Sequence, residues 1–306
     1  MNSIEVKNLS KKFGEFTSVN NISFNVKKGE VFGFLGPNGA GKSTTIRMLC
    51  GILKPTSGDA IVGGFSVMNQ PEKVKQKIGY MSQKFSLYND LTVEENINFF
   101  GNIYGLTNSV LEERKKWVLS VADLIGKEKL LTNSLPGGIK QRLALGTAVI
   151  HRPEIVFLDE PTSGVDPIAR RIFWELINSL SEDGTTVFVT THYLEEAEYC
   201  NNIILIDAGK LIAEGNSKEL KERYIQNKIL EIECERISEA IEILSKEYFV
   251  EESNIFGNSI HISVNNFYQS EEQIKNILSV NSINVLKVSE VNPTLEDVFI
   301  HLVDKK

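Results

Sequence analysis

Residues 36–44 read GPNGAGKST, a glycine-rich loop that ends in a lysine and two hydroxyl residues. The loop satisfies the pattern G-x-x-x-x-G-K-[ST]. It follows EVFGFLG at 30–36, a run typical of a strand, and leads into STTIRMLCGIL at 43–53, a run typical of a helix. In this context the backbone N–H groups surround phosphate oxygens, and the helix N-terminus adds partial positive charge. The sequence therefore predicts a phosphate-binding loop.

The residues of this loop have distinct expected roles. The glycines Gly36, Gly39 and Gly41 let the backbone approach the phosphates and adopt torsion angles that other residues disfavour. Lys42 is expected to reach the β- and γ-phosphates, and Ser43 is expected to hold Mg²⁺. The remaining loop members expected to contact the nucleotide are Pro37, Asn38, Ala40 and Thr44.

A second motif, IVFLDE at 155–160, has four apolar residues followed by two acids. A buried strand places such acids at its carboxyl end, the edge where ligands bind in open α/β sheets. Taken alone, the two acids favour an ordinary strand end with solvated side chains over a functional site. Beside a phosphate-binding loop, Asp159 is expected to hold Mg²⁺ through water and Glu160 to polarise the attacking water, as phosphoryl transfer requires.

Composition restricts the class of protein. The chain has 306 residues, of which 42% are hydrophobic, and no apolar run approaches the length of a membrane-spanning helix. The three cysteines are far apart and fit neither a disulfide framework nor a zinc site, which favours a reducing cytoplasm. Residues 1–227 carry 26 basic and 26 acidic side chains, whereas residues 228–306 carry 7 and 14. This acidic end argues against a tail that binds nucleic acid or anionic lipid.

The pattern of apolar residues divides the chain into two parts. Residues 1–225 alternate strand-like and helix-like runs, which predicts an α/β core of parallel strands. The segment from about 85 to 150 is richer in helical spacing and is expected to form a helical subdomain. Residues 226–306 read strand, helix, two strands joined by a Gly-Asn turn, helix, strand and helix. That order predicts a small α+β domain of the split-βαβ type.

A third motif, LPGGI at 135–139, completes a recognisable series. With the phosphate loop and the IVFLDE strand in the same order, residues 1 to about 225 resemble the ATP-binding subunit of ATP-binding-cassette (ABC) transporters. The resemblance implies a P-loop NTPase core that binds ATP and Mg²⁺ and hydrolyses ATP. It also implies that two subunits meet head to tail, with ATP held between one phosphate loop and the other subunit's signature loop. That signature corresponds here to Leu135, Pro136, Gly137 and Gly138.

The proline is a departure from the family's usual Leu-Ser-Gly-Gly-Gln. Proline suits the first turn of a helix, where its missing N–H has no intrahelical partner. The N–H groups of Gly137 and Gly138 remain for the γ-phosphate, but the serine hydroxyl is lost. A hydrogen bond to a charged group contributes about 1.5–3 kcal/mol. Slower hydrolysis, compensation by a neighbour and pairing with a different subunit are all compatible with this change.

The resemblance assigns further residues one at a time. Gln83 in GYMSQKFSLY matches the glutamine that contacts Mg²⁺ or its water, and His192 in TTHYLEEAE matches the histidine that contacts the γ-phosphate. With Glu160 they form the expected catalytic set. Asp166 in SGVD matches the loop that crosses the dimer, and Phe13 in KKFG matches the aromatic residue that stacks on adenine.

The absence of a membrane span in this sequence implies a separate permease, for which residues of about 85–100 match the docking region. The ending NPTLEDVFIHLV at 292–303 resembles the tail of exporter ATPases. We therefore expect an ATP-hydrolysing subunit of an exporter of drugs, lipids or polysaccharides, peripheral to the cytoplasmic face of the membrane. It is expected to form a homodimer, or a heterodimer with a second ATPase, on binding ATP. An importer ATPase with a regulatory C-terminal domain, a soluble non-transport ABC ATPase and a non-hydrolysing regulator are the alternatives.

Overall fold

The computed structural model describes residues 1–84, 86–264 and 267–304. The chain divides into two compact units, Met1–Asn216 and Ser217–Lys306. This boundary lies earlier than the expected residue 225. The reason is that helix α7 (Ser217–Tyr224) packs against helix α10 (Leu295–Asp304) and so belongs to the second unit. No helix among the described residues is both long enough and apolar enough to cross a membrane.

A six-stranded sheet with the order β10-β9-β3-β8-β7-β6 forms the centre of the first unit. Its parallel strands are β9 (Asn202–Asp207), β3 (Val31–Leu35), β8 (Thr186–Thr191), β7 (Ile155–Asp159) and β6 (Ile78–Met81). The edge strand β10 (Lys210–Gly215) pairs antiparallel with β9. Strands β3, β7 and β8 are buried along their whole length, which is why they read as apolar runs in the sequence.

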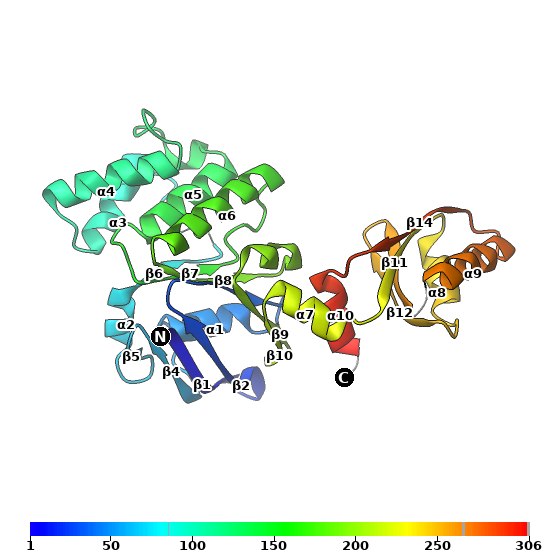
Figure 1. The fold of residues 1–306 in the computed structure, drawn as a ribbon. Helices are drawn as coiled ribbons and strands as arrows, with labels where there is room; N and C mark the ends of the chain where they lie inside the picture. Colours follow the sequence, from blue (N-terminus) through cyan, green and yellow to red (C-terminus); the bar gives the residue numbers. More distant parts are fainter. Residues whose placement is uncertain (85, 265–266, 305–306) are drawn as a thin grey trace. The chain divides into compact units, whose positions relative to one another are not determined.

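One face of this sheet is covered by helix α1 (Lys42–Leu49) and by a second, antiparallel sheet (Figure 1). That sheet has the order β2-β1-β4-β5 and comprises β1 (Asn2–Phe13), β2 (Phe16–Lys27), β4 (Ser57–Val62) and β5 (Phe65–Ser66). Phe24 of β2 lies against the rings of Phe32, Phe34 and Phe188 from the central sheet. This aromatic cluster fixes the two sheets around α1 and so sets the position of the loop that precedes it. The short helix α2 (Pro71–Lys77) leads into β6.

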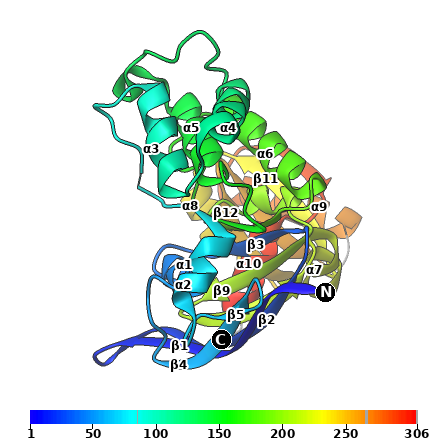
Figure 2. The same ribbon diagram turned by 90° about the vertical axis from the view of Figure 1, so that its left-hand side faces the viewer.

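The other face carries a layer of helices, seen above the sheet in Figures 1 and 2. These are α3 (Val93–Ile103), α4 (Asn108–Val121), α5 (Gly137–Ala148) and α6 (Pro167–Glu182), with short 3-10 turns at Thr132–Ser134 and Leu194–Tyr199. Trp174 of α6 is fully buried in this layer together with Phe173 and Ile177. Helices α3, α4 and α5 fall within the segment expected to be helical.

The second unit has a four-stranded antiparallel sheet with the order β12-β13-β11-β14. In chain order its elements are β11 (Lys228–Cys234), α8 (Ile237–Leu244), β12 (Val250–Phe256), β13 (Ser259–Val264), α9 (Phe267–Val280) and β14 (Val285–Val291), followed by α10. This strand–helix–strand–strand–helix–strand order confirms the α+β prediction. Residues of α8 and α9 share one apolar core with the sheet. His261 of β13 contacts Asp297 of α10 through Nδ1 and Oδ1, 3.0 Å apart.

Candidate nucleotide-binding site

The glycine-rich loop runs from the end of β3 into α1 and needs glycine at two positions for different reasons. Gly41 adopts a φ of 105°, and a Cβ there would lie 2.5 Å from the Ser18 carbonyl oxygen. At Gly36 a Cβ would collide with the Ile206 carbonyl oxygen. Only glycine fits both sites, because any side chain would displace backbone of a neighbouring strand. The loop borders a cavity of about 300 Å³ lined by Phe16, Ser18, Asn38, Gly39, Gly41, Lys42, Ser43, Thr44, Gln83 and Glu160.

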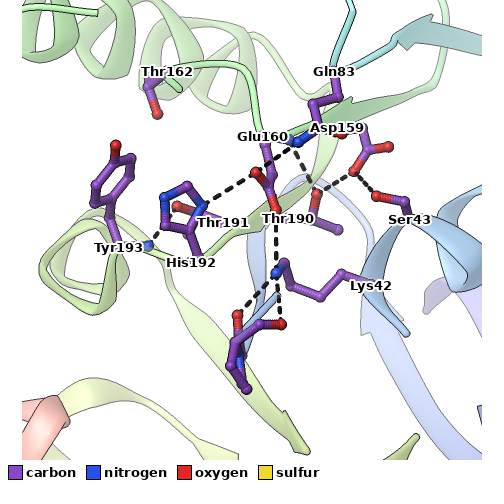
Figure 3. Close-up of polar contacts among 12 residues, drawn as sticks. Lys42, Ser43, Gln83, Asp159, Glu160, Thr162, Thr190, Thr191, His192 and Tyr193 are labelled. Carbon is purple, nitrogen blue, oxygen red and sulfur yellow. Dashed lines mark hydrogen bonds and ion pairs between the residues drawn. The ribbon is translucent and has the colours of Figure 1, made fainter. Parts of the chain in front are cut away.

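Lys42 is held inward at the centre of this loop. Its Nζ donates hydrogen bonds to the carbonyl oxygens of Gly36 (2.8 Å) and Pro37 (3.1 Å). The same Nζ lies 3.1 Å from Glu160 Oε1 in an ion pair (Figure 3). The ammonium group is thus already desolvated and aimed at the cavity, where a phosphate oxygen could replace the carboxylate.

The carboxylate of Glu160 joins three segments that are far apart in the sequence. Oε1 faces Lys42, while Oε2 accepts a hydrogen bond from Gln83 Nε2 at 3.0 Å and lies 3.1 Å from His192 Nδ1 (Figure 3). Only 6% of the Glu160 side chain is exposed. The structure therefore brings together all three residues expected to be catalytic, together with the lysine of the phosphate loop.

The backbone at Glu160 explains how one carboxylate reaches these partners. Strand β7 ends at Asp159, and Glu160 turns out of the sheet with a φ of 48°, a left-handed conformation that is rare for a non-glycine residue. Its N–H donates to both the carbonyl oxygen and Oγ1 of Thr190, each at 3.1 Å. Strain of this kind is typical of functional sites, where the surrounding structure compensates for it.

Asp159 lies beside the phosphate loop and has a different environment. Its Oδ1 accepts hydrogen bonds from Ser43 Oγ (3.0 Å) and Thr190 Oγ1 (2.7 Å). Burial raises the pKa of Asp159, against the lowering effect of these two hydrogen bonds. Among the described residues no group of three or more histidine, cysteine or acidic side chains could hold a metal ion.

This donor set fits Mg²⁺ better than a metal held by protein alone. Mg²⁺ prefers hard oxygen ligands and is usually bound through one or two carboxylates plus the phosphates of its substrate. Ser43 Oγ and the Asp159 carboxylate provide such oxygens, and the amide of Gln83 borders the same cavity. When bound, the ion would neutralise charge on the β- and γ-phosphates.

The LPGGI segment forms the start of α5, and the proline lies one position earlier than expected. Pro136 is the N-cap residue, with φ −57° and ψ 151°, and contributes no side-chain cap. The helix begins at Gly137, and its first N–H groups have no intrahelical partners. Proline therefore removes no N–H that the helix needs and fixes the entry of the chain into α5. The missing element is a capping hydroxyl.

The two glycines of this segment are required for different reasons. A Cβ at Gly138 would lie 2.5 Å from the Cβ of Ala169 on α6, so a side chain there would push the two helices apart. Around Gly137 a Cβ would meet no atom of the described residues within 4 Å. Gly138 is explained by packing against α6, whereas no contact with the part of the chain that the structure describes explains Gly137.

Several predicted residues lie apart from the cavity. The signature segment, Phe13 and Asp166 are not among its lining residues. Asp166 instead caps α6, where its Oδ1 accepts a hydrogen bond from Ala169 N at 2.9 Å. Phe13 is half exposed, with Lys11 Nζ 5.2 Å from its ring centre.

Sequence analysis missed Phe16 and Ser18, both of which line the cavity. Phe16 is paired with Phe13 across the turn between β1 and β2 and is 63% exposed, and Ser18 Oγ donates to Thr44 Oγ1 at 2.9 Å. The stretch KKFGEF shows two aromatic residues around a glycine turn. That pattern could have indicated that an aromatic ring faces the site, but nothing local in it distinguishes Phe13 from Phe16.

Known protein families match successive parts of the chain. The profile described as "ABC transporter" matches residues 19–163, and that described as "ATP-binding protein DrrA1-3-like, C-terminal domain" matches residues 215–303. A third, "AAA domain, putative AbiEii toxin, Type IV TA system", matches residues 133–196. The linearmycin resistance ATP-binding protein LnrL of Bacillus subtilis is 37% identical over 304 residues, covering 98% of this chain and 97% of that protein. The chain therefore belongs to the family of ABC transporter ATP-binding proteins.

Other relatives cover the chain to different extents. The probable multidrug ABC transporter ATP-binding protein YbhF of Escherichia coli is 53% identical over 218 residues, covering 71% of this chain but 38% of that protein. This chain thus spans less than half the length of YbhF. A Nod factor export ATP-binding protein I of Cupriavidus metallidurans is 32% identical and matches 99% of this chain and 98% of its own length.

Solved structures match a large part of the chain. An ATP-binding subunit of an ABC transporter has a TM-score of 0.66 and 28% identity, covering 72% of this chain and 92% of its own. The ATP-binding cassette MJ0796, solved as a dimer in a post-hydrolysis state with ADP and Pi, has a TM-score of 0.64 and 29% identity, covering 70% of this chain and 98% of its own. The α/β core expected from the sequence is confirmed.

Proposed function

We propose that this chain binds Mg²⁺-ATP and hydrolyses it, and that hydrolysis powers export through a separate membrane-spanning permease. The observation that supports ATP hydrolysis is the buried Glu160 carboxylate, which contacts Lys42, Gln83 and His192. A nucleotide-binding domain without catalysis has no need for an acid at this point. A general base, by contrast, must lie within hydrogen-bond reach of the water that it activates.

Each residue of the site has a separate role in this proposal. Lys42 leaves Glu160 Oε1 and pairs with the β- and γ-phosphates, which frees that oxygen to accept a proton from the attacking water. Gln83 and His192 keep their contacts with Oε2 and so hold the carboxylate in place. His192 would then face the γ-phosphate, and Ser43 and Asp159 would hold the cation. Positioning and charge neutralisation of this kind are the main requirements of phosphoryl transfer.

A second ATP-binding subunit completes the site in this proposal. The signature segment is not part of the chain's own cavity, and the open space around Gly137 would admit a γ-phosphate from another subunit. The dimeric state of MJ0796 with ADP and Pi supports the same arrangement. We propose a homodimer, or a heterodimer with a second ATPase, that closes on ATP and opens after hydrolysis.

Export is the proposed direction of transport. Support comes from relatives that match nearly the whole chain, which are named for linearmycin resistance and Nod factor export, and from YbhF, named as a probable multidrug transporter protein. A drug, a lipid or a polysaccharide is the proposed class of cargo, and the cytoplasmic face of the membrane is the proposed location.

The decisive experiment is the mass of the Glu160→Gln chain in solution with and without Mg²⁺-ATP, measured by light scattering beside the ATPase rate of the wild type. Phosphate release by the wild type, with an ATP-dependent dimer of the variant, is the expected result. A wild type that binds ATP without releasing phosphate would overturn hydrolysis. A variant that binds ATP but stays monomeric would overturn the homodimer. The neighbouring genes test direction, since a solute-binding protein gene would contradict export.

A further inference from the structure

Arg170 lies in the first turn of α6, immediately after the loop that follows Glu160, and contacts that loop. Its Nη2 lies 3.5 Å from the carbonyl oxygen of Val165, at the limit of hydrogen-bond distance. Only 17% of the Arg170 side chain is exposed. The guanidinium is therefore held against the protein, unlike that of the adjacent Arg171, whose side chain is 68% exposed.

The same guanidinium contacts the segment that carries His192. Its Nη1 donates to Glu195 Oε1 at 2.7 Å, and its Nε lies 3.5 Å from Oε1 of Glu196. Its Cζ lies 4.2 Å from the ring centre of Tyr193, the distance of a cation–π contact. Arg170 thus makes three contacts with a run of four residues.

Tyr193 transmits this contact to the imidazole of His192. The two ring centres are 4.1 Å apart and their planes are inclined by 37°. In Figure 3 the imidazole is drawn between the Tyr193 ring and the Glu160 carboxylate, which lies 3.1 Å from its Nδ1. A continuous series of contacts therefore runs from α6 to the site through Arg170, Tyr193, His192 and Glu160.

A second connection runs through Glu196, which is fully buried. Its Oε1 accepts a hydrogen bond from Thr162 Oγ1 at 2.5 Å, and Thr162 lies in the loop after Glu160. Arg170 Nε and Glu196 Oε2 are buried and lack hydrogen-bond partners among the described residues. Unsatisfied buried atoms are rare, and these two lie where Arg170 meets the segment that follows His192.

We propose that Arg170 is a positioning residue, which fixes the imidazole of His192 against Glu160 through the Tyr193 ring and ties it to the loop that ends at Asp166. The inference rests on the proposed hydrolysis of ATP. Movement of that loop, which another subunit would contact, would change the placement of the imidazole through Arg170. The residue touches neither nucleotide nor water in this scheme.

The direct test uses the imidazole signals of the full chain in ¹H–¹⁵N spectra, without nucleotide. The chain has four histidines, and loss of one signal in His192→Gln identifies that of His192. Arg170→Met is expected to shift the His192 signal and to leave those of His151, His261 and His301 in place. Arg171→Met, the adjacent control, is expected to shift none. If the His192 signal of Arg170→Met has the same chemical shift as that of the wild type, the proposal is overturned.

The kinetic test asks whether Arg170 acts through His192. Since a displacement of about 1 Å in a reacting group costs on the order of 10²-fold, Arg170→Met should lower kcat by about 10- to 100-fold. KM for ATP should stay within about twofold, because uniform binding is not affected. In a His192→Ala background, Arg170→Met should cause no further loss, since residues that act as a unit are not additive.

Independent losses that multiply in the double variant would show a general structural role and overturn the proposal. If Arg170→Met does not fold, as judged by thermal unfolding, Tyr193→Leu tests the same path from the other side. Tyr193→Leu is expected to lower kcat by the same factor as Arg170→Met. In a His192→Ala background it should likewise cause no further loss. A wild type without ATPase activity would contradict the proposed function, whereas the spectra would still decide whether Arg170 positions His192.

Discussion

Lys42 and Glu160 form a buried ion pair, with Nζ 3.1 Å from Oε1 and side chains that are 4% and 6% exposed. In the proposed reaction one of them binds phosphate and the other activates water, so this pairing is an alternative to nucleotide binding. Neutralising a buried pair within the protein keeps both groups desolvated and in place before ATP arrives. Substitution of Glu160 should therefore impair hydrolysis, whereas substitution of Lys42 should impair ATP binding.

Glu160→Gln removes the base and also the partner that competes for Lys42. We expect kcat to fall by about 10²–10⁴-fold, the usual contribution of a general base, while ATP binds as tightly as in the wild type or more tightly. Phosphate release and calorimetric titration with Mg²⁺-ATP measure the two effects. The matched control is Glu154→Gln, which changes an exposed glutamate just before β7 and should leave both unchanged. Normal turnover in Glu160→Gln would exclude Glu160 as the base.

Lys42→Ala is expected to weaken ATP binding itself. A charge-assisted hydrogen bond contributes about 1.5–3 kcal/mol, so the Kd for ATP should rise by about 10- to 100-fold. The Glu160 carboxylate keeps its contacts with Gln83 and His192, and the fold should therefore persist. Titration with Mg²⁺-ATP measures the Kd of Lys42→Ala and of the control Lys77→Ala. The control removes a half-exposed lysine that is paired with Glu154. Equal affinities in the two variants would contradict the assignment of Lys42.

Pro136→Ser restores a hydroxyl at the N-cap of α5, where the torsion angles of Pro136 already suit serine. We expect dimerisation of the Glu160→Gln chain to need about tenfold less ATP, since each site gains a hydrogen bond of about 1.5–3 kcal/mol to a charged group. Light scattering across an ATP titration measures this. Pro136→Ala, which restores the N–H alone, is the control. If it behaves like Pro136→Ser, the hydroxyl is not the missing element.

Gly138→Ala should lower the stability of the chain, whereas Gly137→Ala should abolish its ATP-dependent dimerisation. Gly138→Ala brings a Cβ to 2.5 Å from that of Ala169, so we expect its free energy of unfolding to drop by about 1–3 kcal/mol. Gly137→Ala has room within the chain and should be at least as stable as the wild type, because alanine favours a helix by up to about 1 kcal/mol. It should nevertheless lose the ATP-dependent dimer. Thermal unfolding and light scattering distinguish the two, and a dimer in Gly137→Ala would contradict capping of the phosphate by this segment.

His151 gives the first unit a defined acid sensitivity. Its Nε2 lies 3.1 Å from the Ile78 carbonyl oxygen, its ring stacks on Tyr104 with centres 3.7 Å apart, and its Nδ1 is buried without a partner among the described residues. Burial lowers the pKa of His151 to about 4. An unfolded histidine has a pKa of about 6.5, so below this pH the unfolded chain binds a proton that the folded chain does not.

The free energy of unfolding should therefore fall between pH 6.5 and 4, by at most about 1.4 kcal/mol per pH unit from this residue. His151→Phe keeps the stacking but cannot titrate. Its stability should be lower at neutral pH, because the Ile78 carbonyl oxygen loses its donor, and should depend less on pH across this window. Urea unfolding at a series of pH values measures both slopes. Equal slopes would show that His151 does not titrate in this range.

The sequence by itself determined the features that depend on a few consecutive residues. The loop at 36–44 requires glycine for its torsion angles, and its motif already includes the lysine and the serine. Strands β3, β7 and β8 are buried on both faces, so they appear as apolar runs, and the acids that end β7 stand out against them. The order of elements in the second unit followed from the same local patterns.

The tertiary structure alone decided which distant residues meet. The strand-end pattern selected Glu160, and the family resemblance selected Gln83 and His192 one at a time. The parallel order β3-β8-β7-β6 brings the three to one edge of the sheet, where one carboxylate contacts both partners and Lys42. Phe16 lines the cavity whereas its cross-strand partner Phe13 does not, and the contact of α7 with α10 places the unit boundary at residue 216. These relationships depend on pairing and packing between segments remote in the chain, and no local pattern records them because each segment would look the same with another neighbour.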